Sequence, residues 1–246
     1  TLNEDGSRRW IRPKPSNGKW MIRRRAVAYG LMALYLAIPH LRWNDKPWMQ
    51  LDFPKREFTF FGTTFQPTDT LLLMLLFVSV LIGVFLLTAL FGRVWCGWAC
   101  PQTVYTEIFM WIERHVEGDR SARLKLDAAS MSLSKFGRRF AKHAIWAALA
   151  LWTGFTFVGF FSPIQELAAE VGSLGLGPWE GFWMLFYAAF TYLFAGHMRE
   201  QVCKYMCPYA RFQGVMFDPD TLIVSYDANR GEPRGNKKKA KEGQPV

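Results

Sequence analysis

The sequence predicts an all-α membrane protein with four transmembrane helices, arranged as two parallel repeats that each end in a Cys-x-x-x-Cys-Pro motif and an interfacial helix. Three observations predict this fold: long uncharged apolar runs, an uneven distribution of Lys and Arg, and a cysteine motif that recurs after 107 positions. Half of the 246 residues are apolar, yet the formal net charge is +10. Apolar and basic residues therefore occupy separate blocks, as is typical of membrane proteins.

Uncharged runs define the predicted spans. Residues 70–91 form a run of 22 residues without a charge, which is enough to cross about 30 Å of hydrocarbon as a helix. Two further runs follow, of which the last carries only Glu180. The first run is short and needs the side chains of Arg23, Arg24 and Arg25 to reach the membrane surface. The predicted spans are about 26–42, 70–91, 143–161 and 179–198.

The loop charges predict the orientation. Eight Lys and Arg residues precede Ala26, nine lie in 92–142 and nine follow Met198, whereas 40–68 has four and 162–178 has none. Because Lys and Arg accumulate on the cytoplasmic side, both termini of this multi-pass protein are expected in the cytoplasm. The predicted domains are a basic N-terminal segment, a four-span membrane domain and a cytoplasmic tail, at 1–25, 26–217 and 218–246.

The segments between the spans carry weaker signals. Residues 53–65 alternate apolar and polar side chains, which predicts a small hairpin on the outer membrane surface. Residues 127–139 are polar and Ser-rich, and we expect a tether there. Residues 227–246 are highly charged and are expected to remain unfolded near anionic lipid. The Lys and Arg residues flank apolar runs, so they favour a role in topology over nucleic-acid binding.

The candidate site consists of the four cysteines, at Cys96, Cys100, Cys203 and Cys207. Two cysteines four positions apart lie on one face of a helix and can bind one metal or one edge of a cluster. Both motifs follow a span that runs from outside to inside, so both are expected at the cytoplasmic boundary, where a parallel repeat lets them approach each other. The pattern predicts a redox or metal role more strongly than burial of four small side chains.

The residues around the cysteines add two expectations. A proline after each pair can begin a new helix, and apolar residues then recur at helical spacing over 104–112, with a shorter counterpart at 208–217. Nearby cations would favour the thiolate form of the cysteines. These cations are Arg93, Arg199, Lys204 and Arg211.

The cysteine chemistry leaves several ligands open. Four converging thiolates could hold a [4Fe–4S] cluster, a [2Fe–2S] cluster, Zn²⁺ or Cu(I), or could form a reversible disulfide across the repeat. Iron–sulfur motifs commonly place Pro after the last Cys, but their pairs are spaced Cys-x-x-Cys. His197 lies six residues before Cys203 and could complete a site, although packing at the interface is the favoured role of all four histidines.

Several stretches resemble the cytochrome c oxidase accessory protein family CcoG, also called FixG or RdxA. The resemblance covers nearly the whole chain and is carried by Thr1–Pro15, Phe61–Asp69, Thr88–Tyr105, Cys203–Gln213 and Asp220–Gly235. More distantly, the cysteine motifs are similar to those of the NapH-like membrane ferredoxins. In the CcoG family the Arg-Gly-Glu-Pro-Arg-Gly stretch leads into a cytoplasmic ferredoxin domain, whose cysteine motifs are not expected within the residues up to Val246.

The resemblance implies assembly of a cbb3-type oxidase in the bacterial inner membrane, with electrons passed to copper so that Cu(II) becomes Cu(I). It would make the chain part of a cupric reductase, with the four cysteines as the membrane motif residues. The implied partners are the membrane, oxidase subunits or copper chaperones, and an electron donor, either a ferredoxin domain or quinol. Two alternatives remain at this stage: a NapH-like quinol-linked electron-transfer subunit and a non-redox assembly scaffold. The resemblance implies that the chain is the membrane portion of a longer protein or relies on another donor.

Overall fold

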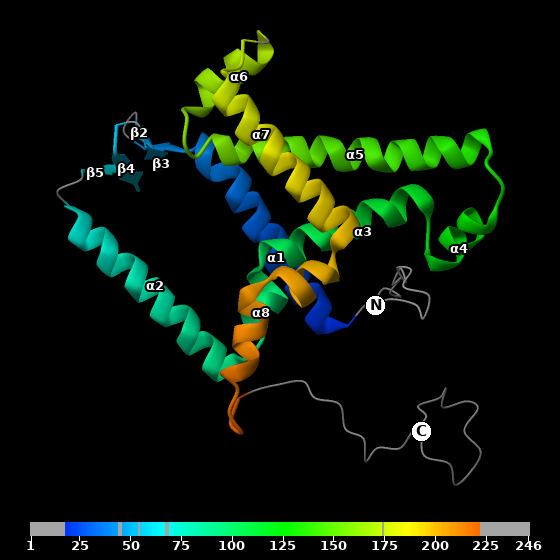
Figure 1. Cartoon of the computed structure of the whole chain (residues 1–246), viewed down its shortest axis with the longest axis horizontal. Helices are drawn as coiled ribbons and strands as arrows, with labels where there is room; N and C mark the ends of the chain where they lie inside the picture. The colour runs from blue at the N-terminus through cyan, green and yellow to red at the C-terminus, as the bar shows by residue number, and fades with distance from the viewer. Residues whose placement is uncertain (1–17, 44–45, 54, 67–68, 174, 222–246) are drawn as a thin grey trace.

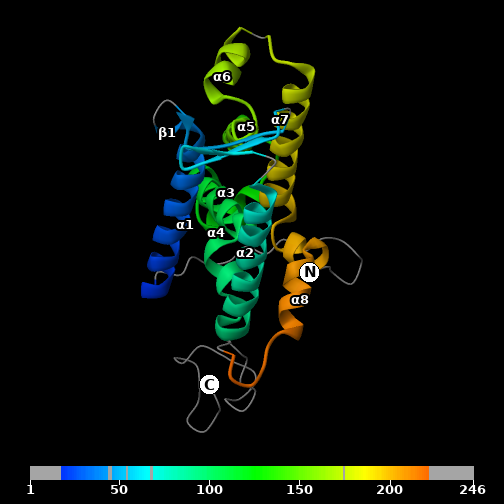
Figure 2. The same ribbon diagram turned by 90° about the vertical axis from the view of Figure 1, so that its left-hand side faces the viewer.

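The protein is mainly helical. The computed structural model describes residues 18–43, 46–53, 55–66, 69–173 and 175–221. The N-terminal segment 1–17 and the predicted unfolded tail lie outside the described residues. The strands lie at one end of α1 and α2, and α8 lies at the opposite end of α2, as Figures 1 and 2 show.

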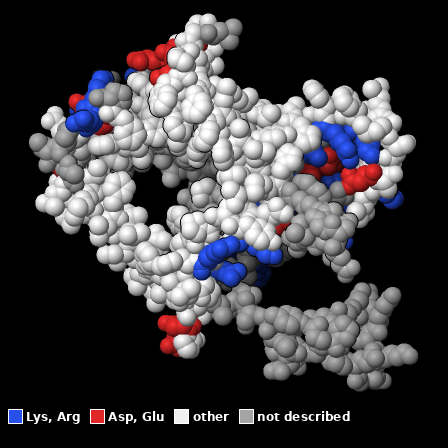
Figure 3. Space-filling view, viewed as in Figure 1, with Lys and Arg blue, Asp and Glu red and all other residues white. Residues whose placement is uncertain are grey.

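The helix α2 (Thr70–Phe91) has the bounds predicted from the uncharged run. Within the described residues, its segment Leu71–Phe91 is the one helix long and apolar enough to cross a membrane. Only 6% of the most apolar 18-residue stretch of this helix is buried, whereas a core helix of a soluble protein would be mostly buried. In Figure 3 the region over α2 shows no charged residues along its length, whereas Lys and Arg gather in patches elsewhere on the visible face. The exposed apolar surface of α2 indicates association with a membrane.

The other predicted spans correspond to helices with different bounds. The first helix, α1 (Lys19–Ala37), begins seven residues before Ala26 and ends in the 3-10 turn Ile38–His40, so it begins and ends earlier than the predicted span of about 26–42. The helix α7 (Pro178–Thr191) continues as a π-helical segment, Tyr192–Met198. Figure 1 shows α1, α2 and α7 running in a similar direction, with α5 crossing them obliquely.

The helix α5 (Leu133–Val158) corrects the predicted tether. It begins ten residues before His143, because the Ser132 side chain accepts a hydrogen bond from the Lys135 N–H (3.3 Å) and caps the helix. A further helix, α4 (Arg120–Ala128), occupies the start of the same segment. Only the few residues between α4 and α5 are non-helical, so the Ser-rich composition reflected a helix cap.

The loop after α1 contains more strand than the predicted hairpin. The strands β1 (Arg42–Trp43) and β2 (Lys46–Pro47) pair with each other, and a three-stranded antiparallel sheet follows with the order β3-β4-β5. Its strands are Met49–Asp52, Glu57–Phe60 and Thr63–Phe65. The alternation of apolar and polar side chains over 53–65 correctly predicted β-strands in this loop. Strand pairing, however, begins before residue 53. The Leu51 N–H donates to the Phe160 carbonyl oxygen (2.8 Å) and ties this sheet to the end of α5.

The core lies where α3 (Pro101–Glu117) crosses α5 and the π-helical segment after α7. Phe109 is fully buried and its ring lies 5.3 Å from that of Trp146. The Trp146 indole N–H donates to the Phe109 carbonyl oxygen (3.1 Å). Beside them, Ala195 is also buried. This core packs the helix that follows the first cysteine motif against the segment that precedes the second.

Candidate functional site

The two cysteine motifs have the same backbone conformation. Gly92 and Arg199 each stand four residues before a cysteine pair, with φ and ψ of 59° and −116° and of 48° and −117°. A π-helical turn follows in each half, over Trp95–Ala99 and Val202–Met206. Gly92 and Arg199 are 107 positions apart, and so are the two π-helical turns, which is the spacing of the cysteine motifs. The repeat inferred from the sequence therefore extends to backbone geometry around both motifs.

The last cysteine of each motif caps a new helix. Cys100 and Cys207 adopt extended backbone conformations, and Pro101 and Pro208 begin α3 and α8 (Pro208–Phe212). Proline suits this first position because it has no N–H to leave unpaired. The helices predicted after both prolines are present, and the second is the shorter, as expected.

Reciprocal hydrogen bonds join the two halves. The Gln102 side-chain N–H₂ in α3 donates to the carbonyl oxygens of Phe194 (2.9 Å) and Arg199 (3.3 Å), before the second motif. Its counterpart 107 residues later is Tyr209 in α8, whose hydroxyl pairs with that of Thr88 before the first motif. Each half therefore holds the end of the other half's long helix, as two motifs related by a pseudo-twofold axis would.

All four cysteines are free thiols and half-buried. The Cys96 thiol donates to the Gln213 side-chain oxygen across the repeat (3.5 Å). Burial, together with smaller contributions from the nearby Cys100, Cys207 and Cys203, raises the pKa of Cys96 to about 11. Burial also raises the pKa of Cys203, again with contributions from Cys100 and Cys207. Thiols from both halves thus lie close enough to influence each other.

The nearby cations do not decide the pKa of the Cys96 thiol in the metal-free site. Arg93 lowers the pKa of Cys96, but it is the smallest of the causes acting on that thiol. The Arg199 guanidinium instead forms an ion pair with Glu113, and the Lys204 ammonium lies over the Tyr205 ring at 5.3 Å. Desolvation is the largest cause at both Cys96 and Cys203, so these two thiols would ionise mainly when a metal centre binds them.

The four thiols are of the donor type that holds an iron–sulfur cluster. Within the described residues, no group of three or more His, Cys, Asp or Glu side chains could hold one metal ion. The four thiolates of a [4Fe–4S] cluster bind four different irons, so they stand farther apart than four ligands of one ion. Four free, half-buried thiols from two matched turns are the donors that such a cluster takes. A hollow of ≈ 300 Å³ lies beside Cys203 and is lined in part by Gln102, Thr103 and Arg199.

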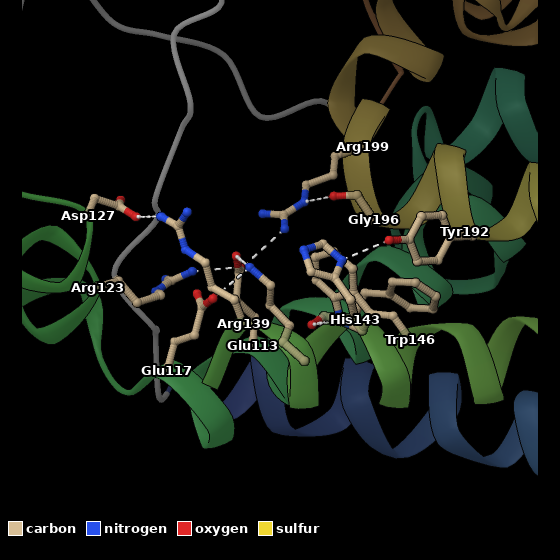
Figure 4. A network of polar contacts seen from close by, with 12 residues as sticks. Glu113, Glu117, Arg123, Asp127, Arg139, His143, Trp146, Tyr192, Gly196 and Arg199 are labelled. Carbon is tan, nitrogen blue, oxygen red and sulfur yellow. Dashed lines mark hydrogen bonds and ion pairs between the residues drawn. The ribbon is translucent and has the colours of Figure 1, made fainter. Parts of the chain in front are cut away.

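A buried charge network beside the site was not predicted from the sequence. Glu113 in α3 accepts from Arg199 (3.0 Å) and Arg123 (2.7 Å), and Lys142 pairs with Glu117 (2.6 Å). Figure 4 shows these side chains converging from α3, α4, α5 and the segment before the second motif. From the sequence, Arg123 and Lys142 are interpreted as topology signals and Arg199 as a cation that favours the nearby thiolates. The one available signal was the placement of two glutamates, Glu113 and Glu117, one helical turn apart on a helix near many cations.

His143 and His197 pack among aromatic rings beside the second motif. His197 and His143 stack with ring centroids 6.1 Å apart, and both lie against Trp146. The His143 Nδ1 atom is 2.7 Å from the Tyr192 hydroxyl. His115 Nδ1 is 2.9 Å from the Trp111 carbonyl oxygen. His197 thus lies in the aromatic and polar layer between α5 and the segment after α7.

Comparison with known families supports an iron–sulfur cofactor. A 4Fe-4S binding domain matches residues 72–117, which include Cys96 and Cys100. A 4Fe-4S dicluster domain matches residues 198–245, which include Cys203 and Cys207. No solved structure matches the chain significantly. The helical fold, the exposed apolar helix α2 and the two matched motifs define a membrane-associated iron–sulfur electron-transfer protein.

Three curated relatives identify the family. The chain is 39% identical to the nitrogen fixation protein FixG of Rhizobium meliloti, over 97% of this chain and 47% of the relative. It is 37% and 36% identical to proteins RdxA and RdxB of Cereibacter sphaeroides, over 92% and 95% of this chain and 48% and 50% of those relatives. The chain belongs to the FixG/RdxA (CcoG) family, and it spans about half the length of these relatives.

Proposed function

We propose that this chain is the membrane electron-transfer part of a protein that serves the assembly of a cbb3-type cytochrome c oxidase. Cys96, Cys100, Cys203 and Cys207 hold one [4Fe–4S] cluster at the cytoplasmic boundary of the membrane. The observation that carries this proposal is the reciprocal bonding of the two motifs, in which Gln102 and Tyr209 each bond to the opposite half. The influence of Cys100, Cys203 and Cys207 on the pKa of Cys96 supports it.

The proposed topology has four spans, built on α1, α2, α5 and α7, with both termini in the cytoplasm. The exposed apolar surface of α2 and the alternation of basic and neutral loops support it. Residues 1–25 and 218–246 are then cytoplasmic and residues 26–217 form the membrane domain of an inner-membrane protein. The cytoplasmic side is therefore where electrons would enter.

A bound [4Fe–4S] cluster supplies one-electron transfer at a potential set by its surroundings. The residues of this chain bind the cluster through thiolates, limit water by half-burying them and place the Gln213 amide beside Cys96. The proposed overall reaction converts Cu(II) to Cu(I) with one electron from a ferredoxin-class or quinol donor. Copper is thus a substrate, and its handover would involve oxidase subunits or a copper chaperone. The hollow beside Cys203 offers access to the site.

Anaerobic reduction assays test this function. Protein purified anaerobically in detergent is reduced chemically, freed of reductant and mixed with Cu(II) and a chromogenic Cu(I) chelator. We expect Cu(I) to form in proportion to the cluster content, and Cys203→Ser to abolish both. If the protein contains the cluster, and quinol reduces that cluster but Cu(II) is not reduced, the result would support the quinol-linked alternative. A protein without iron or sulfide that still supports oxidase assembly would support the scaffold alternative.

A further inference from the structure

The second half of the repeat contains an arginine where the first half contains a glycine. Gly92 adopts a positive φ of 59°, which costs glycine little because it has no Cβ. Arg199 adopts a φ of 48° and a ψ of −117° at the equivalent position, which an L-residue rarely adopts. Glycine would serve the backbone here as well as it does at position 92. The side chain of Arg199 must therefore contribute something that offsets the strain.

The contacts of Arg199 indicate what it contributes. Its Nε atom donates to the Gly196 carbonyl oxygen (2.9 Å), and its Nη2 atom donates to Glu113 (3.0 Å). The residue is 5% exposed, and its guanidinium also lies over the Trp146 ring at 5.8 Å. A buried arginine whose guanidinium donates to two fixed acceptors is held more rigidly than a surface arginine. Figure 4 shows the guanidinium between the Gly196 carbonyl and the carboxylate of Glu113.

The partners of Arg199 tie it to the first cysteine motif. Glu113 belongs to α3, the helix that begins directly after Cys100. The Arg199 carbonyl oxygen accepts from Gln102 in the first turn of the same helix (3.3 Å). Both the side chain and the backbone of Arg199 are therefore held by the helix that the first motif starts. Four residues later the chain reaches Cys203.

We propose that Arg199 is a positioning residue, whose ion pair with Glu113 holds the strained turn that sets Cys203 and Cys207 against the first cysteine pair. The role rests on the proposed function, because the four cysteines are the site that it arranges. Arg123, which pairs with the same oxygen of Glu113, keeps that carboxylate in place and so supports Arg199 indirectly. The equivalent turn at Gly92 needs no such side chain.

Three substitutions separate positioning from backbone strain. Arg199→Gly removes the side chain and relieves the strain, as at Gly92, whereas Arg199→Gln removes the charge and keeps the strain. Arg139→Gln is the matched control, because Arg139 also forms an ion pair, with Asp127 (3.0 Å), but is half-exposed and lies on α5. Each protein is purified anaerobically, and its reduced electron paramagnetic resonance spectrum is recorded. Labelling of each cysteine by a maleimide is then followed in metal-free protein by mass spectrometry.

We expect Cys203 and Cys207 to react roughly fivefold or more faster in both Arg199 variants, because the second turn opens more often. Cys96 and Cys100 should react as in the parent, and the g-values should shift in both variants and not in Arg139→Gln. If Arg199→Gly has the same labelling rates and the same spectrum as the parent, the proposal is overturned. Equal acceleration of labelling at all four cysteines would also overturn it. A parent without iron and sulfide would contradict the proposed function alone, since the labelling still reports on the turn.

Discussion

The hydroxyl groups of Tyr209 and Thr88 form a hydrogen bond between residues 121 positions apart in the sequence. This bond joins the helix after the second cysteine motif to the end of α2, which leads into the first. Thr88 is 1% exposed, and its hydroxyl also bonds to the Val84 carbonyl oxygen (2.7 Å). Thr88 therefore keeps a partner when the tyrosine hydroxyl is removed.

Replacing Tyr209 by Phe should lower the free energy of unfolding by about 1 kcal/mol, the net contribution of one such hydrogen bond. Unfolding in detergent, followed by tryptophan fluorescence, measures the change. Tyr205→Phe is the control, because Tyr205 belongs to the same motif but is exposed. Equal stability of the two variants would show that the Tyr209 hydroxyl does not join the halves.

Replacing Gly92 by Ala should destabilise the protein by roughly 1–3 kcal/mol, because a Cβ is strained at its positive φ. Gly83→Ala in the middle of α2 is the control, since no atom lies within 4 Å of its added Cβ and alanine favours the helix. The same unfolding assay compares the two. If Gly92→Ala is as stable as Gly83→Ala, the turn before the first motif differs from the one described.

Replacing Gly154 by Ala should separate α5 from α7. The added Cβ would collide with the Met184 carbonyl oxygen, which is backbone and cannot rotate away. We expect a loss of roughly 1–3 kcal/mol, as for overpacked interiors. Gly137→Ala on the same helix has open space around its Cβ and should be neutral or stabilising. A neutral Gly154→Ala in thermal unfolding would contradict the close α5–α7 packing.

The raised pKa of Cys96 predicts a pH dependence in metal-free protein. Its folded pKa of about 11 lies above the ordinary value of 9.0, so folding favours the neutral thiol. That contribution to stability is complete below pH 9 and is lost as the pH rises from 9 to 11. Alkylation of Cys96 should therefore remain slow at pH 8 and increase up to about pH 11. A rate that levels off near pH 9 would show that burial does not raise the pKa.

The sequence predicted the features that depend on composition along one helix. The uncharged run gave the bounds of α2, and the matched spacing gave both motifs and the helices after Pro101 and Pro208. The start of α5 was missed because Ser132 reads equally well as a loop residue or a helix cap.

The charge network was missed because it depends on tertiary contacts. Glu113 and Arg199 are 86 positions apart, and their pairing requires the crossing of α3 with the segment after α7. The raised pKa of Cys96 was not predicted for the same reason. Burial of Cys96 has more influence on its pKa than the charge of Arg93, and burial follows from the fold.

The most direct measurement is the iron and acid-labile sulfide content of the anaerobically purified protein, compared with single Cys→Ser variants in each motif. A cluster shared by both motifs predicts about four iron and four sulfide per chain, lost or strongly reduced in Cys96→Ser and in Cys203→Ser alike. Protein with no iron, or a cluster that Cys203→Ser leaves intact, would contradict a site built from both halves of the repeat.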